Sequence, residues 1–98
     1  MLIRGGENVY PLEVERVLEA HPGVVEAAVY GVPDRRLGQE IAAAVVGVDG
    51  APPGADELAE WCRGRLAPFK IPRTWTVVDA LPRTASGKLL RRALPNES

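Results

Sequence analysis

Two short stretches of this sequence carry the residue types best suited to binding or catalysis. The first is Arg4–Asn8 (RGGEN), and the second is Pro82–Lys88 (PRTASGK). Paired glycines allow a backbone to approach a ligand closely, although they equally permit a plain left-handed turn. A lysine beside a glycine at a loop tip can reach into a partner site and stabilise phosphate or carboxylate charge, or it can be an ordinary solvated lysine.

The position of Lys88 is slightly unfavourable for the stability of the helix predicted after it. Ser86 can cap a last helix whose apolar stripe lies at positions 90, 93 and 94. Lys88 then falls in the first turn, where the helix dipole disfavours a cation by about a few tenths of a kcal/mol. The stretch is not a Walker A loop, because that motif needs a glycine where Pro82 stands.

Other reactive residue types are too few for the common catalytic or metal sites. His21 is the only histidine, and its place beside Pro22 is typical of a helix end rather than of a ligand. Cys62 is the only cysteine, which excludes an internal disulfide and a cysteine-rich zinc site and is consistent with a reducing cytoplasm. We therefore expect no metal site and no Ser-His-Asp triad. No apolar run approaches the roughly 20 residues of a membrane span, and no signal peptide is recognisable.

Charge is distributed unevenly along the 98 residues. Up to Glu60 there are four basic and eleven acidic residues, whereas from Trp61 onward there are eight basic and two acidic residues. The basic part is either a solvated face or a surface that meets an anion. Because aromatic residues are few and are not interleaved with the arginines, we expect no nucleic-acid partner and favour a small phosphorylated ligand.

Proline and glycine divide the chain into short elements. We predict a hairpin over residues 2–10, with its turn at the paired glycines, and a helix from Pro11 to about His21 with Val14, Val17 and Leu18 on one face. A second helix, capped by Asp56 and ended by Pro68, would place Leu58, Trp61, Cys62 and Leu66 on one face. Strands are predicted over Val24–Val32, Gln39–Val48 and Arg73–Asp79, although the alanines of the second would also suit a helix.

The order of these elements predicts an α+β fold in one domain covering residues 1–98. We expect a small, mainly antiparallel sheet of about three strands plus the N-terminal hairpin, covered by two or three helices.

The two reactive stretches, taken with their neighbours, resemble AMP-forming acyl-CoA synthetases of the adenylate-forming ligase superfamily. Arg4–Glu15 (RGGENVYPLEVE) is similar to the hairpin motif near the hinge of these enzymes. Phe69–Pro72 (FKIP) and Leu81–Arg92 (LPRTASGKLLRR) resemble the lysine motif with which the sequences of these enzymes end. Between them, His21–Val24 and Gly31–Asp34 stand where the family carries similar signatures, so the resemblance spans nearly the whole chain in order.

The resemblance implies that the chain is the mobile C-terminal lid domain of an acid–CoA ligase, a class that includes enzymes of fatty acid metabolism. The large N-terminal adenylation domain, with its phosphate loop and acyl pocket, would be absent, and the chain would start just after the hinge. ATP with Mg²⁺, a carboxylic acid and CoA would be the ligands of the full-length enzyme. We expect none of them bound to the isolated domain, which should be inactive.

Residue roles follow from the same resemblance. Lys88 matches the catalytic lysine that enters the site while acid and ATP form acyl-AMP, with Ser86 and Gly87 beside it at the substrate. The hairpin would replace it when CoA attacks, and Gly5, Gly6 and Glu7 would leave a passage for the pantetheine arm. Some relatives have arginine where Asn8 stands. Peptide-synthetase adenylation domains usually differ at positions 7–11, which favours CoA over a carrier protein.

The spacing of Pro82, Gly87 and Lys88 matches that of related synthetases whose reactive lysine is acetylated, so a lysine acetyltransferase is an expected partner. The alternative to the enzyme-domain interpretation is a stand-alone regulatory module without catalysis. It would capture an anion or a partner through its cationic side chains, Lys70, Arg83, Lys88, Arg91 and Arg92.

Overall fold

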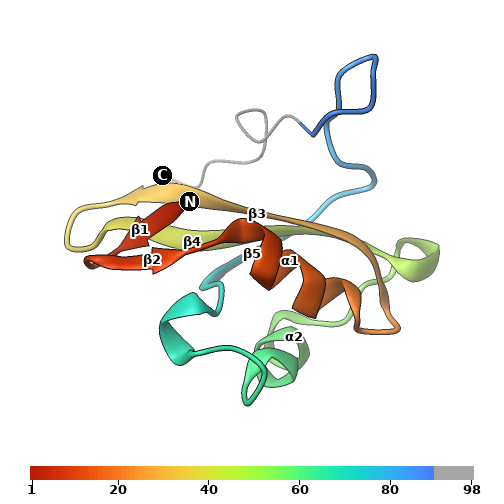
Figure 1. The fold of residues 1–98 in the computed structure, drawn as a ribbon. Coiled ribbons are helices and arrows are strands. Elements are labelled where there is room, and N and C mark those ends of the chain that lie inside the picture. The colour runs from red at the N-terminus through yellow and green to blue at the C-terminus, as the bar shows by residue number, and fades with distance from the viewer. Residues whose placement is uncertain (90–98) are drawn as a thin grey trace.

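The computed structural model describes residues 1–89, which form five strands, two α-helices and two single turns of 3-10 helix (Figure 1). The strands are β1 (Leu2–Arg4), β2 (Glu7–Val9), β3 (Val24–Asp34), β4 (Gly38–Gly47) and β5 (Thr74–Val77). The helices are α1 (Pro11–Glu19) and α2 (Ala55–Cys62), and the 3-10 turns are η1 (Val48–Gly50) and η2 (Pro68–Lys70). No helix of this described part is long or apolar enough to cross a membrane.

The central sheet has the strand order β3-β4-β5, and β1 and β2 form a separate two-stranded sheet. β3 and β4 are antiparallel, with a register that runs from Val24↔Gly47 to Asp34↔Gly38. β5 is parallel to β4, because the chain crosses over through α2 before it returns to the sheet. The predicted α+β fold, with a three-stranded sheet and an N-terminal hairpin, is confirmed; the sheet is mixed, because its second pairing is parallel.

β4 is buried on both of its faces. From Ile41 to Val45 no residue is more than 1% exposed. Ile41, Ala43 and Val45 belong to the cluster that α1 and α2 cover, whereas Ala42 and Ala44 belong to a second cluster on the opposite face. This alternation is that of a strand, and the small alanine side chains allow packed layers on both sides.

Different parts of the chain cover the two faces of the central sheet. Both helices lie on one face, whereas the C-terminal segment, blue in Figure 1, passes over the other. Leu81 is buried in the second cluster, and Val78 and Leu89 pack against it. The segment that leads to Lys88 is therefore itself part of the fold.

Helix α1 also closes the free edge of β3. The Glu15 carboxylate accepts a hydrogen bond from the Val29 N–H at 2.8 Å, and the Glu19 carboxylate accepts one from the Ala27 N–H at 3.1 Å. The edge strand thus has these backbone donors satisfied by a neighbouring helix. Helical periodicity does not show which backbone groups a carboxylate can reach, so these two bonds could not be predicted from the sequence.

The second helix differs from the prediction at both ends. Asp56 does not cap it; the N-cap position is Gly54, without a side-chain hydrogen bond, and Asp56 lies in the first turn. The helix ends at Cys62 rather than at Pro68, because Arg63 is extended and Gly64 has a φ of 81°.

The apolar residues of that predicted face still pack inward. Leu58 and Cys62 are buried in α2, and Leu66 is buried beyond its end. Trp61 is partly buried and donates a hydrogen bond from Nε1 to the Val17 carbonyl at 2.7 Å. β3 runs two residues further than predicted, to Asp34.

The predicted start of the last helix is wrong: Ser86 does not cap a helix and Lys88 is not helical, because Gly87 has a φ of 91° and Leu89 forms a β-bridge with Arg83. The apolar positions 90, 93 and 94 of that helix lie outside the described residues.

Burial on α1 predicts a large difference between two leucines. Leu18 is 0% exposed and Leu12 is 57% exposed. Leu18→Ala should lower the free energy of unfolding by about 2–5 kcal/mol, because it removes core contacts and leaves a cavity. Leu12→Ala is the matched control and should change it by less than about 0.5 kcal/mol. Urea denaturation of both variants tests this, and equal losses would contradict the packing of α1.

Candidate functional site

The paired glycines form a tight two-residue turn. Arg4 pairs with Glu7 across the hairpin, so that Gly5 and Gly6 connect β1 to β2. Their φ angles are 58° and 85°, the combination that a type I′ turn requires and that glycine adopts without strain. The predicted glycine turn is confirmed. Gly5, Gly6 and Glu7 are all exposed, and a Cβ built on Gly6 would meet no atom within 4 Å.

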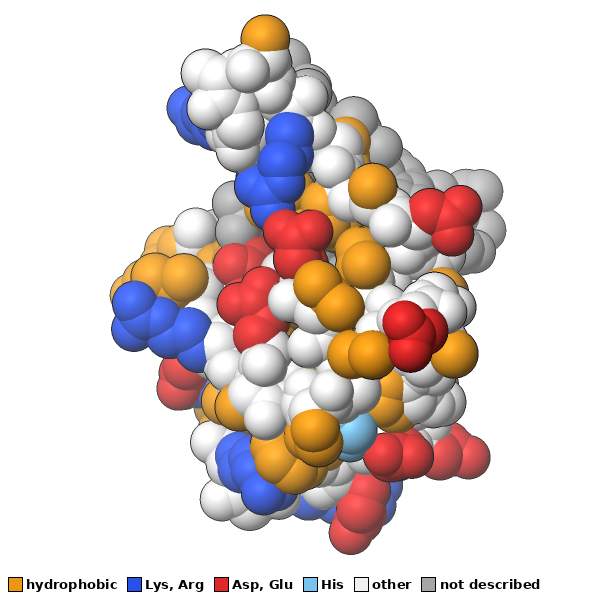
Figure 2. All heavy atoms as spheres, turned by 90° about the vertical axis from the view of Figure 1, so that its right-hand side faces the viewer, with side chains coloured by type: hydrophobic (Ala, Val, Ile, Leu, Met, Phe, Trp, Pro, Cys, Tyr) orange, Lys and Arg blue, Asp and Glu red, His pale blue; other side chains and the backbone are white. Residues whose placement is uncertain are grey.

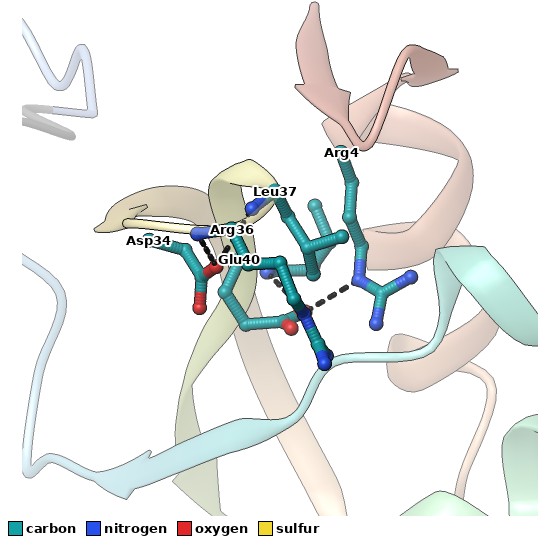
Figure 3. A network of polar contacts seen from close by, with 6 residues as sticks. Arg4, Asp34, Arg36, Leu37 and Glu40 are labelled. Atoms are coloured by element: carbon teal, nitrogen blue, oxygen red, sulfur yellow. Dashed lines mark hydrogen bonds and ion pairs between the residues drawn. The ribbon is translucent and has the colours of Figure 1, made fainter.

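Three contacts hold this hairpin against β4 and the turn before it. The Gly5 N–H donates to the Leu37 carbonyl at 2.9 Å, and the Ile3 N–H donates to Gln39 Oε1 at 2.9 Å. Arg4 Nε donates to Glu40 Oε1 at 2.7 Å, and Figure 3 shows the Arg4 side chain reaching from the hairpin to this carboxylate. The hairpin is therefore fixed to the central sheet by backbone and side-chain bonds.

The Arg4–Glu40 ion pair is largely shielded from solvent, with each side chain 16% exposed. Burial by itself raises the pKa of Glu40. The hydrogen bond from Arg4, the Ile41 N–H and the charges of Arg4 and Arg73 outweigh it, so the pKa lies below its ordinary value of 4.5. Glu40 is thus a carboxylate at neutral pH.

Asp34 shapes the turn that receives the hairpin. Its Oδ1 accepts the Leu37 N–H at 2.8 Å and the Arg36 N–H at 3.0 Å. The Leu37 N–H is the main cause of a lowered pKa for Asp34, against a smaller opposing effect of burial, and the Arg36 N–H and nearby arginine charges add to it. The same Leu37 residue then offers its carbonyl to Gly5.

The lysine stretch forms a closed loop with its own hydrogen bonds. The Gly87 N–H donates to the Thr84 carbonyl at 2.9 Å, and the Thr84 N–H donates to the Lys88 carbonyl at 2.8 Å. The Lys88 N–H donates to Thr84 Oγ1 at 3.0 Å, and the Ser86 hydroxyl lies 3.0 Å from the same oxygen. Gly87 has a φ of 91°, which a residue with a side chain rarely adopts.

This loop presents Lys88 to solvent. Ser86, Gly87 and Lys88 are all exposed, and within residues 1–89 the Lys88 ammonium group has no ion-pair partner. Arg83, by contrast, forms an ion pair with Glu26 on β3 and donates to the Gly87 carbonyl at 3.1 Å. Figure 2 shows the loop standing out from the body of the molecule, with basic and acidic side chains in contact at its base.

The two motifs lie on different faces and at different ends of the sheet. The hairpin contributes Leu2 and Val9 to the helix-side cluster, whereas Leu89 packs on the opposite cluster. Glu26, which anchors the loop, and Asp34, which begins the turn under the hairpin, are eight residues apart on β3. At about 3.3 Å per residue these anchor points are roughly 26 Å apart.

A cationic cavity on the hairpin side was not predicted from the sequence. It has a volume of about 360 Å³ and is lined by Ala59, Arg63, Pro68, Ile71, Pro72 and Arg73. The Arg73 N–H donates to the Ile41 carbonyl, which is adjacent to Glu40, the partner of Arg4. The run of basic residues between positions 63 and 73 was the available signal, but only the fold shows which of them share a cavity.

The lone histidine and cysteine are structural. His21 Nδ1 accepts the Gly23 N–H at 2.9 Å, its Nε2 lies 2.9 Å from Glu57 Oε2, and its ring packs edge-on against Trp61. Cys62 is fully buried, and burial raises the pKa of its thiol. Residues 1–89 contain no cluster of three or more His, Cys, Asp or Glu side chains that could hold a metal ion.

Comparison with known proteins agrees with this architecture. Residues 13–88 match the family described as the AMP-binding enzyme C-terminal domain. A feruloyl-CoA synthase from an Amycolatopsis species is 50% identical over 91 residues, which is 93% of this chain and 18% of that protein. The fatty acid–[acyl-carrier-protein] ligase ScoC from Streptomyces coeruleorubidus is 47% identical over 93 residues, 95% of this chain and 18% of its own length.

Among solved structures, the o-succinylbenzoate CoA synthetase of Bacillus subtilis in complex with its acyl-adenylate intermediate superposes with a TM-score of 0.89. It is 48% identical, and the match covers 98% of this chain and 19% of that one. The chain thus spans less than a fifth of the length of these relatives. It belongs to the family of C-terminal domains of AMP-binding enzymes, and the predicted family is confirmed.

The shielded Arg4–Glu40 pair predicts a dependence of stability on pH. Because the pKa of folded Glu40 is below its ordinary value of 4.5, the pair stabilises the fold above that pH. The stabilisation is lost as the pH falls from there through the folded pKa. Glu40→Gln keeps an oxygen for the Ile41 N–H but removes the charge, so its free energy of unfolding should fall less steeply than that of the wild type between neutral and acid pH.

Urea denaturation at a series of pH values measures this difference. Arg4→Gln removes the other partner of the pair. Its free energy of unfolding should also fall less steeply than that of the wild type as the pH is lowered. Identical slopes for the wild type and both variants would show that the pair does not hold the hairpin.

Proposed function

We propose that residues 1–98 form the mobile lid domain of an AMP-forming carboxylic acid–CoA ligase and act together with a large N-terminal adenylation domain. The observation that carries this proposal is the placement of the two motifs. A free lysine on a closed loop lies on one side of the sheet, and an exposed glycine turn lies on the other. One rigid domain can therefore present either motif to a single site by rotating.

In the first half-reaction an oxygen of the acid attacks the α-phosphorus of ATP, and pyrophosphate leaves as acyl-AMP forms. Negative charge accumulates between the acyl carboxylate and the phosphates during this step. The exposed Lys88 ammonium group would enter the site and stabilise that charge. Ser86 and Gly87, adjacent on the same loop tip, would lie beside the substrate.

In the second half-reaction the CoA sulfur attacks the acyl carbonyl carbon, and AMP leaves. The hairpin would then replace the lysine loop, and Gly5, Gly6 and Glu7 would border the passage of the pantetheine arm. The cavity lined by Arg63 and Arg73 lies on this same side of the sheet, and guanidinium groups bind phosphate well. Arg63 pairs with Glu60, so Arg73 is the lining guanidinium that has no ion-pair partner within residues 1–89. The cavity therefore offers a place for the phosphates of CoA in this orientation.

Other ligands follow from the same proposal. ATP would arrive as its Mg²⁺ complex, and residues 1–89 contain no group of side chains that could hold the metal. CoA is the proposed acceptor, in line with the feruloyl-CoA synthase, although a carrier-protein ligase is also a relative. The unpaired, buried Cys62 agrees with a cytoplasmic location.

The stand-alone anion-binding module is less well supported. Two of its proposed cations are engaged inside the domain, since Lys70 pairs with Glu13 and Arg83 pairs with Glu26. Arg91 and Arg92 lie outside the described residues. Lys88 is then the one proposed cation of the described part that has no ion-pair partner, which suits a single point charge delivered to a site better than an anion-binding surface.

Acetylation of Lys88 is part of the same proposal. The side chain is exposed at the tip of a projecting loop, where an acetyltransferase has access to it. Acetylation would remove the charge on which the first half-reaction depends.

Lys88→Ala in the complete enzyme should reduce acyl-AMP formation by about 10²–10³-fold, the usual effect of losing one stabilising group for developing charge. Thioester formation from supplied acyl-AMP should stay within about twofold, because the lysine has then left the site. Pyrophosphate release and thioester formation, measured separately, test this. Lys88→Gln, which is uncharged like acetyl-lysine, should behave in the same way. Lys70→Ala, at the other lysine of the chain, is the matched control and should leave adenylation unchanged.

Gly6→Leu should show the opposite pattern, with slow thioester formation and near-normal adenylation, because a side chain would narrow the pantetheine passage. Any side chain at a φ of 85° also strains the backbone. Gly50→Leu controls for this strain, since Gly50 has a φ of 72°, has no neighbouring atom within 4 Å of a built Cβ, and lies in η1 away from the hairpin. If Lys88→Ala and Gly6→Leu depress both half-reactions equally, the assignment of one motif to each step is wrong.

A further inference from the structure

Arg83 connects the lysine loop to the central sheet. One guanidinium nitrogen, Nη2, contacts Glu26 Oε1 on β3, and the other, Nη1, donates to the Gly87 carbonyl at 3.1 Å. The Gly87 carbonyl belongs to the peptide bond that joins Gly87 to Lys88. A single side chain thus runs from a strand of the sheet to the peptide bond on which Lys88 is carried.

From this geometry we propose that Glu26 and Arg83 are positioning residues that aim Lys88 for the adenylation step. The inference rests on the proposed function, because it assigns these residues a part in the reaction that Lys88 would serve. Neither side chain needs to touch the substrate. They act by holding the loop at a defined angle to the sheet, so that domain rotation delivers the ammonium group to a reproducible place.

The loop's own hydrogen bonds fix its shape but not its direction. The bonds that link Thr84 with Gly87 and Lys88 all lie within the loop, so they would persist if the loop swung as a unit. Within residues 1–89, the polar tie from the loop to a strand is the contact of Arg83 with Glu26, residues 57 positions apart in the sequence. Loss of that tie leaves the loop intact but free to tilt on its apolar base.

Glu26 is a suitable anchor because its strand is held firmly on both sides. Glu26 pairs with Val46 on the buried strand β4. The next residue, Ala27, donates its N–H to the Glu19 carboxylate of α1. The anchor therefore stands on a strand that is bonded to neighbours on both sides, directly after the bulge between Val24 and Glu26.

Arginine suits this double contact better than lysine. Its planar guanidinium presents several N–H donors in a fixed fork, so it can hold a carboxylate and a carbonyl at once. The pair is partly exposed, with side-chain exposures of 40% for Arg83 and 36% for Glu26. Partly exposed ion pairs contribute little to overall stability. A positioning role and a purely structural role therefore predict different results.

The experiment uses the complete enzyme with Arg83→Met, which removes both contacts, and Glu26→Gln, which removes the charge of the anchor. The rate constant kcat for acyl-AMP formation should fall about tenfold, because the lysine is delivered less accurately. The KM values for ATP and acid should stay nearly constant, since neither residue binds substrate. Thioester formation from supplied acyl-AMP should stay within about twofold. The melting temperatures should be close to that of the wild type.

Further variants sharpen the test. The double variant Glu26→Gln/Arg83→Met should be no less active than the less active of the two single variants, because both changes break the same contact. Arg83→Lys keeps the charge but not the fork and should recover adenylation in part. Arg16→Met, at an exposed arginine on α1, is the matched control and should match the wild type in both half-reactions.

The outcomes distinguish a failure of the positioning role from a failure of the proposed lid function. If Lys88→Ala abolishes adenylation while Arg83→Met and Glu26→Gln do not affect it, the positioning role is overturned and the lid function stands. Equal losses in both half-reactions, or losses that follow a lower melting temperature, also overturn the positioning role. If Lys88→Ala leaves adenylation unchanged, the proposed function fails and the positioning role fails with it.

Discussion

The burial of β4 on both faces is the constraint on which the rest of this structure depends. A strand covered on two sides can carry only small or apolar side chains, and the run Ile41–Val45 meets this requirement with three alanines at its centre. One face receives α1, α2 and the base of the hairpin, and the other receives the segment that leads to Lys88. Two layers, built from different parts of the chain, therefore pack against one central strand.

This arrangement makes the domain a rigid carrier of two separate motifs. The hairpin is bonded to Leu37, Gln39 and Glu40 at one end of β4, and the lysine loop is tied to Glu26 near the start of β3. All of these anchors belong to the same domain. The motifs consequently cannot approach each other, and an exchange of one for the other at a single site requires the whole domain to turn. The two half-reactions of the proposed ligase would then take place at one active site, with a different motif of this domain facing it in each.

Local features were predictable from the sequence because their causes are local. The type I′ turn at Gly5 and Gly6 needs two positive φ angles, and adjacent glycines between short apolar pairs are a direct sign of it. Lys88 was recognisable because a lysine beside a glycine at a loop tip can reach into a partner site. The helix predicted to begin at Ser86 does not begin there, since Gly87 has a positive φ that helical periodicity does not reveal. The end of α2 was predicted wrongly because apolar periodicity continues to Leu66, whereas Gly64 had already turned the chain. The contacts of Glu15, Glu19 and Arg83 could not be predicted, since each joins positions that only the folded chain brings together.

The central claim is that Lys88 enters the reactive site in one step and leaves it in the next. Its most direct test is the rate at which an amine reagent modifies Lys88 in the complete enzyme, followed by mass spectrometry of the peptide. With ATP and an unreactive acid analogue bound, the account predicts slow modification of Lys88. With AMP and CoA bound, it predicts rapid modification at close to the rate of the isolated chain, in which Lys88 is exposed. Equal rates in the two ligand states would contradict the account.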